Sequence, residues 1–60
     1  MFMPGMLVRL PKQRRVMVVT NATADRICCS WYEQNRLKSE VFKAEQLVII
    51  DAGRNHLSYT

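Results

Sequence analysis

The residues best suited to bind an anion lie in one short segment. Lys12, Arg14 and Arg15 place three cations within four positions, directly after a proline. Such a cluster suits phosphate, because each contact neutralises one backbone charge and releases counterions. The alternative interpretation is a solvated loop whose charges only maintain solubility. In either case we expect the loop cations to contribute little to folding stability.

Other positions extend this basic segment if the loops meet in the fold. Small barrels that bind single strands combine a cationic groove with aromatic side chains on which bases stack. Alternation along residues 27–32 points Tyr32 outward and Trp31 into the core. The candidate nucleic-acid-binding residues are therefore Arg9, Lys12, Arg14, Arg15, Tyr32, Arg36 and Lys38.

No residue set predicts a catalytic, cofactor or metal site. His56 has no serine or cysteine nucleophile visibly placed for it, and one histidine with two adjacent cysteines cannot supply four spaced metal ligands. Three glutamates are dispersed among cations, which favours solvated or ion-paired groups over an acid/base pair; they are Glu33, Glu40 and Glu45. We expect no enzymatic activity in the monomer, no cofactor and no small-molecule substrate.

The overall composition describes one small basic domain. The chain has 60 residues and a formal net charge of +4, which favours contact with nucleic acid or an acidic protein surface. Cys28 and Cys29 are neighbours on a predicted strand and point to opposite faces, so we expect free thiols in a reducing cytoplasm. The apolar start is too short for a secretory signal, and no run approaches the length of a membrane helix.

Five apolar runs rich in β-branched or aromatic residues predict five short strands. A cationic loop over residues 11–15 and a turn over residues 21–25 separate the first three. A polar connection over residues 33–36 offers an asparagine for positive φ, and residues 43–46 suit a single helical turn. The predicted strands cover residues 6–10, 16–20, 27–32, 37–42 and 47–50.

These elements predict an all-β fold, a small five-stranded SH3-like barrel with one short helical turn before the last strand. Residues 1–52 would form the domain and residues 53–60 a C-terminal tail. Curling buries one face of the sheet, and the alternative is an open antiparallel sheet completed by a second copy. The expected core comprises Val8, Leu10, Met17, Val19, Ile27, Cys29, Trp31, Phe42, Leu47 and Ile49.

The spacing of the apolar anchors also carries a family resemblance. The anchors are Gly5, Val8, Leu10, Met17, Val19, the run Cys29-Ser30-Trp31-Tyr32, residues 36–42 and Leu47. Over about residues 2–50 this pattern resembles the YodC-like family of uncharacterised small bacterial proteins. Met6 stands where that family has aspartate, and a cationic loop replaces its glycine-rich loop at residues 11–15. The resemblance implies a fold and supplies no catalytic residues.

The sequence thus predicts a small non-enzymatic binding module that contacts nucleic acid weakly through its basic loop. The alternative is a protein interaction or homo-oligomerisation module that acts as an accessory subunit. Alternation places four aliphatic residues away from the core, which predicts an apolar patch and a homodimer; they are Leu7, Val18, Leu37 and Val48. A third alternative is an oligomeric enzyme whose site forms only where several copies meet.

Overall fold

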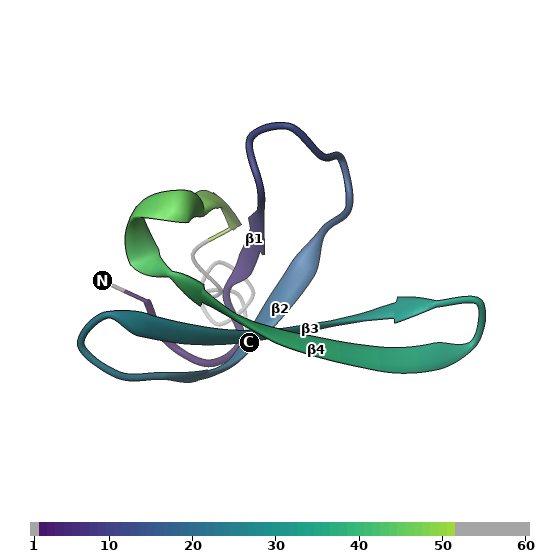
Figure 1. The fold of residues 1–60 in the computed structure, drawn as a ribbon, viewed down its shortest axis with the longest axis horizontal. Coiled ribbons are helices and arrows are strands. Elements are labelled where there is room, and N and C mark those ends of the chain that lie inside the picture. The colour runs from purple at the N-terminus through teal and green to yellow at the C-terminus, as the bar shows by residue number, and fades with distance from the viewer. Residues whose placement is uncertain (1, 52–60) are drawn as a thin grey trace, which may run out of the picture.

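The computed structural model describes residues 2–51, which fold into one antiparallel sheet of five strands (Figure 1). The elements are β1 (Leu7–Arg9), β2 (Met17–Ala22), β3 (Arg26–Glu33), β4 (Arg36–Lys43), the 3₁₀ turn η1 (Ala44–Gln46) and β5 (Val48–Asp51). The predicted all-β fold, with a helical turn before the last strand, is confirmed. The predicted tail at residues 53–60 and His56 lie outside the described residues.

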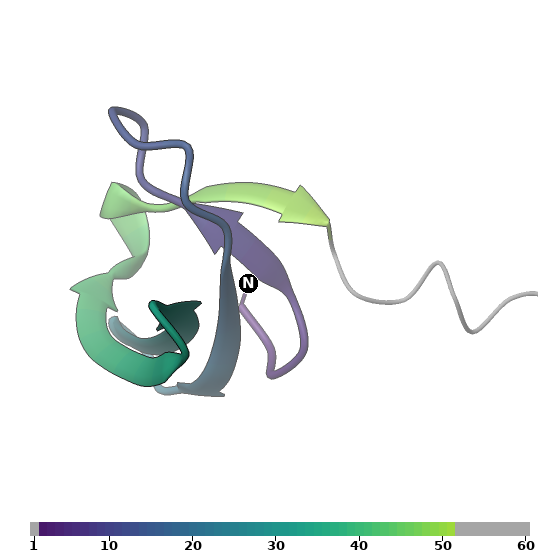
Figure 2. The same cartoon turned by 90° about the vertical axis from the view of Figure 1, so that its right-hand side faces the viewer.

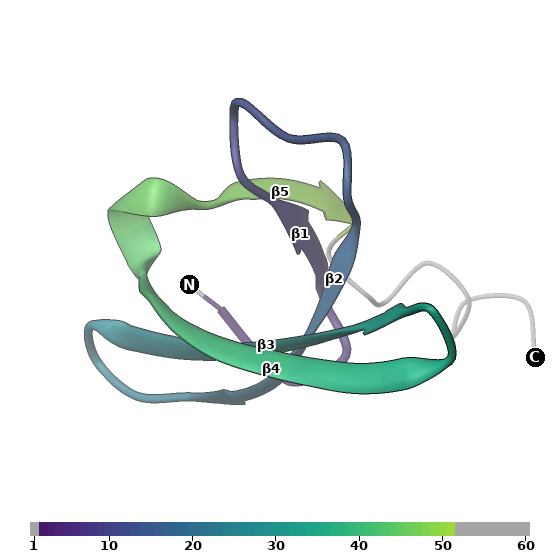
Figure 3. The same ribbon diagram turned by 45° about the vertical axis from the view of Figure 1, so that its right-hand side comes forward.

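The sheet curls strongly but does not close. Its strand order is β4-β3-β2-β1-β5, so β4 and β5 are the two edges and no ladder joins them. Figure 2 shows the curled profile, and Figure 3 shows η1 carrying the chain from one edge to the other. The predicted barrel therefore holds only in a loose sense.

The core lies inside the curl and follows the predicted alternation. Eight apolar side chains are buried there: Met6, Val8, Met17, Val19, Ile27, Cys29, Trp31 and Phe42. Leu10 and Leu47 are half-buried and pack against this cluster. Met6, which the predicted core omitted, is only 4% exposed because the chain folds under β2, with the Gly5 N–H donating to the Val19 carbonyl.

The prediction that Ile49 belongs to the core is wrong. Ile49 pairs with Val8 in the ladder between β5 and β1, yet it is 46% exposed while Val8 is fully buried. Val8 has a strand on each side, whereas β5 forms the edge of the sheet. A side chain on the inner face of an open edge therefore stays in contact with solvent.

The hairpin of β3 and β4 is the longest element of the sheet. Its ladder runs without interruption from Arg26 opposite Lys43 to Glu33 opposite Arg36. The two connecting residues both have positive φ, 54° at Gln34 and 65° at Asn35, which is the geometry of a type I′ turn. This turn matches the right-handed twist of the strands, and the predicted positive φ at the asparagine is confirmed.

Ser30 is buried although alternation places it on the outer face of the sheet. It lies at the centre of β3, opposite Val18 on β2 and opposite Ser39 on β4. Its Oγ lies 2.8 Å from the Ser39 Oγ, so the hydroxyl has a hydrogen-bond partner. A small side chain on a central strand, with a paired strand on each side, is covered even without a second layer.

Candidate functional site

Arg15 joins the basic loop to the β3–β4 hairpin. Its guanidinium carbon lies 4.2 Å from the centre of the Trp31 ring, in cation–π geometry. Its Nη1 also lies 4.0 Å from Glu33 Oε1, while the Trp31 Nε1–H donates to the same oxygen at 3.2 Å. Arg15, Trp31 and Glu33 thus form one connected cluster at the base of the loop.

This cluster changes the role expected of Arg15. Only about a third of its side chain is exposed, and its Nε is buried with no hydrogen-bond partner. A loop cation in such surroundings contributes to packing, because its planar group covers an aromatic ring. Arg15 is therefore not a free loop cation, because it is in contact with Trp31 and lies near Glu33.

Arg9 is also held by its own loop. Its Nη1 lies within 3.4 Å of three carbonyl oxygens, those of Leu10, Pro11 and Gln13. A guanidinium that satisfies several carbonyls of one loop fixes the shape of that loop. We interpret Arg9 as a residue that shapes the loop, with part of its donor capacity already used.

Arg36 and Lys38 lie beside the Arg15 cluster through the register of the hairpin. Arg36 is opposite Glu33, and Lys38 is opposite Trp31. Side chains of directly opposed residues share one face of an antiparallel pair, so both cations lie on the same face as Trp31. Arg15, through its contact with Trp31, therefore lies on the same face of the hairpin as Arg36 and Lys38.

Lys12 and Arg14 lie in the exposed part of the loop that projects from the sheet between β1 and β2 (Figure 1). Within residues 2–51 their side chains make no hydrogen bond or ion pair. The same holds for Arg36 and Lys38. We call these four exposed cations the basic surface: Lys12, Arg14, Arg36 and Lys38.

Tyr32 lies on the opposite face of the hairpin from this surface. It is 75% exposed and sits opposite Leu37, which is 61% exposed. Trp31 is only 8% exposed, and the Arg15 guanidinium lies over its ring. The structure thus separates the one outward aromatic residue of β3 from the cations with which it was expected to act.

No family model, curated protein or solved structure matches the chain. The resemblance to the YodC-like family stays a prediction.

The two cysteines differ in exposure, as alternation predicts. Cys28 is half-buried and Cys29 fully buried, and both are free thiols. Burial raises the pKa of the Cys29 thiol from its ordinary value of 9.0 to about 11, and the charge of Cys28 adds to this effect. Cys29 therefore stays protonated and unreactive at neutral pH.

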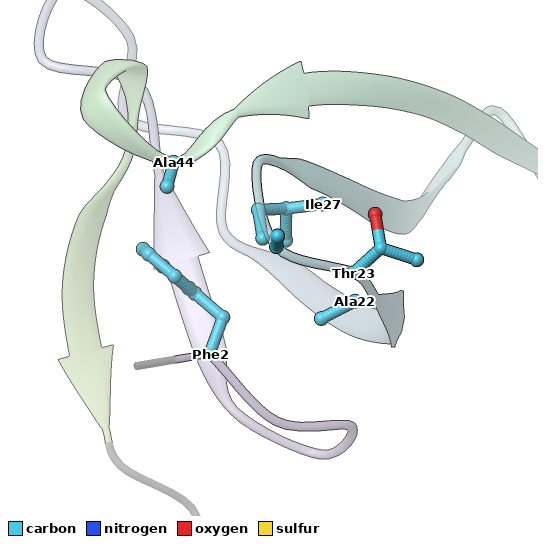
Figure 4. A pocket seen from close by; sticks show the side chains of 6 residues that line it. Phe2, Ala22, Thr23, Ile27 and Ala44 are labelled. Carbon is cyan, nitrogen blue, oxygen red and sulfur yellow. The ribbon is translucent and has the colours of Figure 1, made fainter.

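A pocket at the open side of the curl offers little chemistry. Figure 4 shows it between the N-terminal segment, the turn before β3 and η1; its lining residues are Phe2, Ala22, Thr23, Ala24, Ile27 and Ala44. Thr23 supplies the polar side chain of this set, and its hydroxyl donates to the Arg26 carbonyl at 3.3 Å. The described side chains thus give the pocket no free polar group to orient a substrate.

Residues 2–51 contain neither a cluster of metal-ligand residue types nor a long apolar helix. No three histidine, cysteine or acidic side chains in this range gather as metal ligands would. The same range contains no helix with the length and hydropathy that crossing a bilayer requires.

Proposed function

We propose that the chain is a non-enzymatic binding module that contacts the backbone of single-stranded nucleic acid through the basic surface. The observation that supports this most is the position of Arg15, which ties the basic loop to the hairpin that carries Arg36 and Lys38. Arg15 thereby connects two cationic segments that are distant in sequence. We also place the module in the cytoplasm, since both cysteines are free thiols.

Phosphate contact is favoured over base recognition. The four cations are free to pair with phosphates, and the absence of an α-helix from residues 2–51 leaves no element suited to a major groove. Trp31 is covered by Arg15, and Tyr32 faces away from the basic surface. Binding would therefore be weak, insensitive to sequence and strongly dependent on salt.

The test is a titration of labelled single-stranded RNA at several salt concentrations. Four phosphate contacts give a log–log salt slope of roughly −3, from about −0.7 per contact on single strands. Replacing Lys12 and Arg14 by glutamine should reduce this slope by about half, and so should the same change at Arg36 and Lys38. Arg15 stays unchanged in both variants, because its loss would also disturb the fold.

The matched control removes two cations from the other end of the hairpin. Arg26 and Lys43 are exposed and oppose each other there. Replacing both by glutamine changes the net charge equally and should leave the slope near that of the parent. Equal weakening in all three double variants would indicate attraction by net charge alone and would overturn the proposed surface.

A second candidate function is protein interaction or homo-oligomerisation. The observation that favours it is a set of exposed apolar side chains near the two edges of the sheet: Tyr32, Leu37, Val41, Val48, Ile49 and Ile50. Leu7 and Val18, predicted to join such a patch, are half-buried because they oppose each other in the ladder. No binding of the parent to RNA would favour this second candidate.

A further inference from the structure

The edge strand β4 is unusually open. It pairs only with β3 among the described strands, and seven of its eight residues are exposed. The other edge, β5, has four residues, and a register irregularity interrupts its ladder with β1. A long and regular free edge is a template for pairing with another strand. β4 is therefore the better place for an added strand.

The hairpin geometry identifies the backbone groups that point away from the sheet. A two-residue turn is flanked by a hydrogen-bonded pair, here Glu33 and Arg36, and such pairs alternate along an antiparallel ladder. The intervening residues of β4 then direct their N–H and C=O groups outward. These residues are Leu37, Ser39 and Val41.

The same strand is its own antiparallel complement. In a two-fold pairing centred on Ser39, Leu37 opposes Val41 of the second copy, and Ser39 opposes itself. The three residues that direct their backbone groups outward then pair only with each other. On the other face Lys38 opposes Glu40, and the two-fold axis repeats this pair. Opposite charges and apolar residues are both favourable cross-strand neighbours.

Neighbouring registers lack this match. Centring the pairing on Lys38 places two lysines opposite each other, and centring it on Glu40 places two glutamates together. Both arrangements oppose like charges at the axis, which is unfavourable. A shift by one residue would set the inner face of one copy against the outer face of the other. The charges of β4 thus select one register.

We propose that β4 pairs with β4 of a second copy of this chain, antiparallel and centred on Ser39, to form a ten-stranded sheet. The partner strand is β4 of a second copy because one register matches the charges, the apolar residues and the outward backbone groups at the same time. An isologous contact of this kind closes as a dimer. This inference specifies the second candidate function. Lys38 also belongs to the basic surface, so the dimer is measured without nucleic acid and its failure would leave the proposed phosphate contacts untouched.

The first test exchanges charges and measures mass by sedimentation in the absence of nucleic acid. The parent should form a species of twice the 7.0 kDa chain mass. Lys38→Glu and Glu40→Lys should each weaken the dimer about tenfold, because each creates two like-charge contacts. An equimolar mixture of the two variants should regain affinity as a heterodimer, since glutamates of one strand then face lysines of the other.

The matched control is Lys12→Glu, which makes the same charge change on the loop between β1 and β2, outside the β4 strand. Its dimer should have the affinity of the parent. A parent that stays at the mass of one chain would overturn the proposal. A dimer whose affinity is the same in the parent, Lys38→Glu and Glu40→Lys would also overturn it, because self-association would then use another surface. Masses above the dimer would indicate open-ended pairing of β4 with β5 and overturn it too.

The second test reads the register directly. Residues of a hydrogen-bonded antiparallel pair have Cα atoms about 5.5 Å apart, within the range of a disulfide. In a Cys28→Ser background, Ser39→Cys should cross-link to its own copy under mild oxidation. Leu37→Cys should not, because it faces Val41. Buried Cys29 should not interfere. Cross-linking of Leu37→Cys but not of Ser39→Cys would overturn the register.

Discussion

Arg15 has the sequence context of a loop cation and the contacts of a packing residue. Its guanidinium covers Trp31 and approaches the carboxylate of Glu33. The contact depends on a residue sixteen positions later in the chain, so no local pattern around residues 11–15 predicts it. The contact between Arg15 and Trp31 can be recognised only once the strand register is known, because the register places an aromatic residue beside the cation-rich loop.

Arg15→Gln should therefore lower stability, unlike neutralisation of its neighbour. A partly exposed cation–π contact contributes about 0.5–1 kcal/mol, which corresponds to a fall in melting temperature of about 2–8 °C for a domain of this size. Thermal unfolding by circular dichroism measures the change. Arg14→Gln is the control and should melt with the parent; equal melting of both variants would show that the Trp31 contact has no energetic weight.

The buried thiol of Cys29 predicts a loss of stability at alkaline pH. Its pKa is raised from 9.0 to about 11 in the fold, so the unfolded chain releases this proton first. The stabilising effect is complete below pH 9 and disappears as the pH rises towards 11. Urea unfolding at pH 8 and pH 10.5 should show a larger loss in the parent than in Cys29→Ala. Equal losses would mean that other groups cause the alkaline transition.

At the scale of elements, local pattern predicted where strands occur and tertiary position decided what they bury. β-branched and aromatic runs located all five strands, with ends displaced by up to two residues. Alternation failed at Ile49 because the sheet stays open beside β5, and at Ser30 because both neighbouring strands cover it. Alternation specifies a face, whereas exposure depends on what lies next to that face.

The candidate site was also only partly predictable from the sequence. The cations could be read from the sequence, but the register of β3 with β4 decided that Tyr32 lies on the other face of the hairpin.

The turn between β3 and β4 should respond to residues that tolerate positive φ. Gln34 lies in the left-handed region, which is unfavourable for its side chain. Replacing Gln34-Asn35 by Asn-Gly should raise the free energy of unfolding by about 1 kcal/mol.

Gly5→Ala should lower the free energy of unfolding. Gly5 has φ 96°, which is unfavourable for alanine even though no atom lies within 4 Å of an added Cβ. Denaturant unfolding measures both, and an unchanged midpoint for the Asn-Gly variant would contradict the turn assignment.

At the scale of the whole molecule, pairing through β4 predicts that stability depends on protein concentration. A partner that binds only the folded chain raises its melting temperature by mass action. The parent should melt several degrees higher at about 500 μM than at about 5 μM, whereas Lys38→Glu should show a smaller shift. Differential scanning fluorimetry across this range provides the measurement. Identical shifts in the two proteins would exclude β4 as the source.

The ladder between β1 and β5 has a consequence for translation. β1 ends at Arg9 and β5 begins at Val48, so the ribosome adds the partner of β1 roughly 2–8 s after β1 itself, at about 5–20 residues per second. The β3–β4 hairpin needs only local contacts and can form earlier. During that interval one side of β1 has no partner strand in the nascent chain. The final pairing of the sheet therefore waits for the strand that is synthesised last among the five.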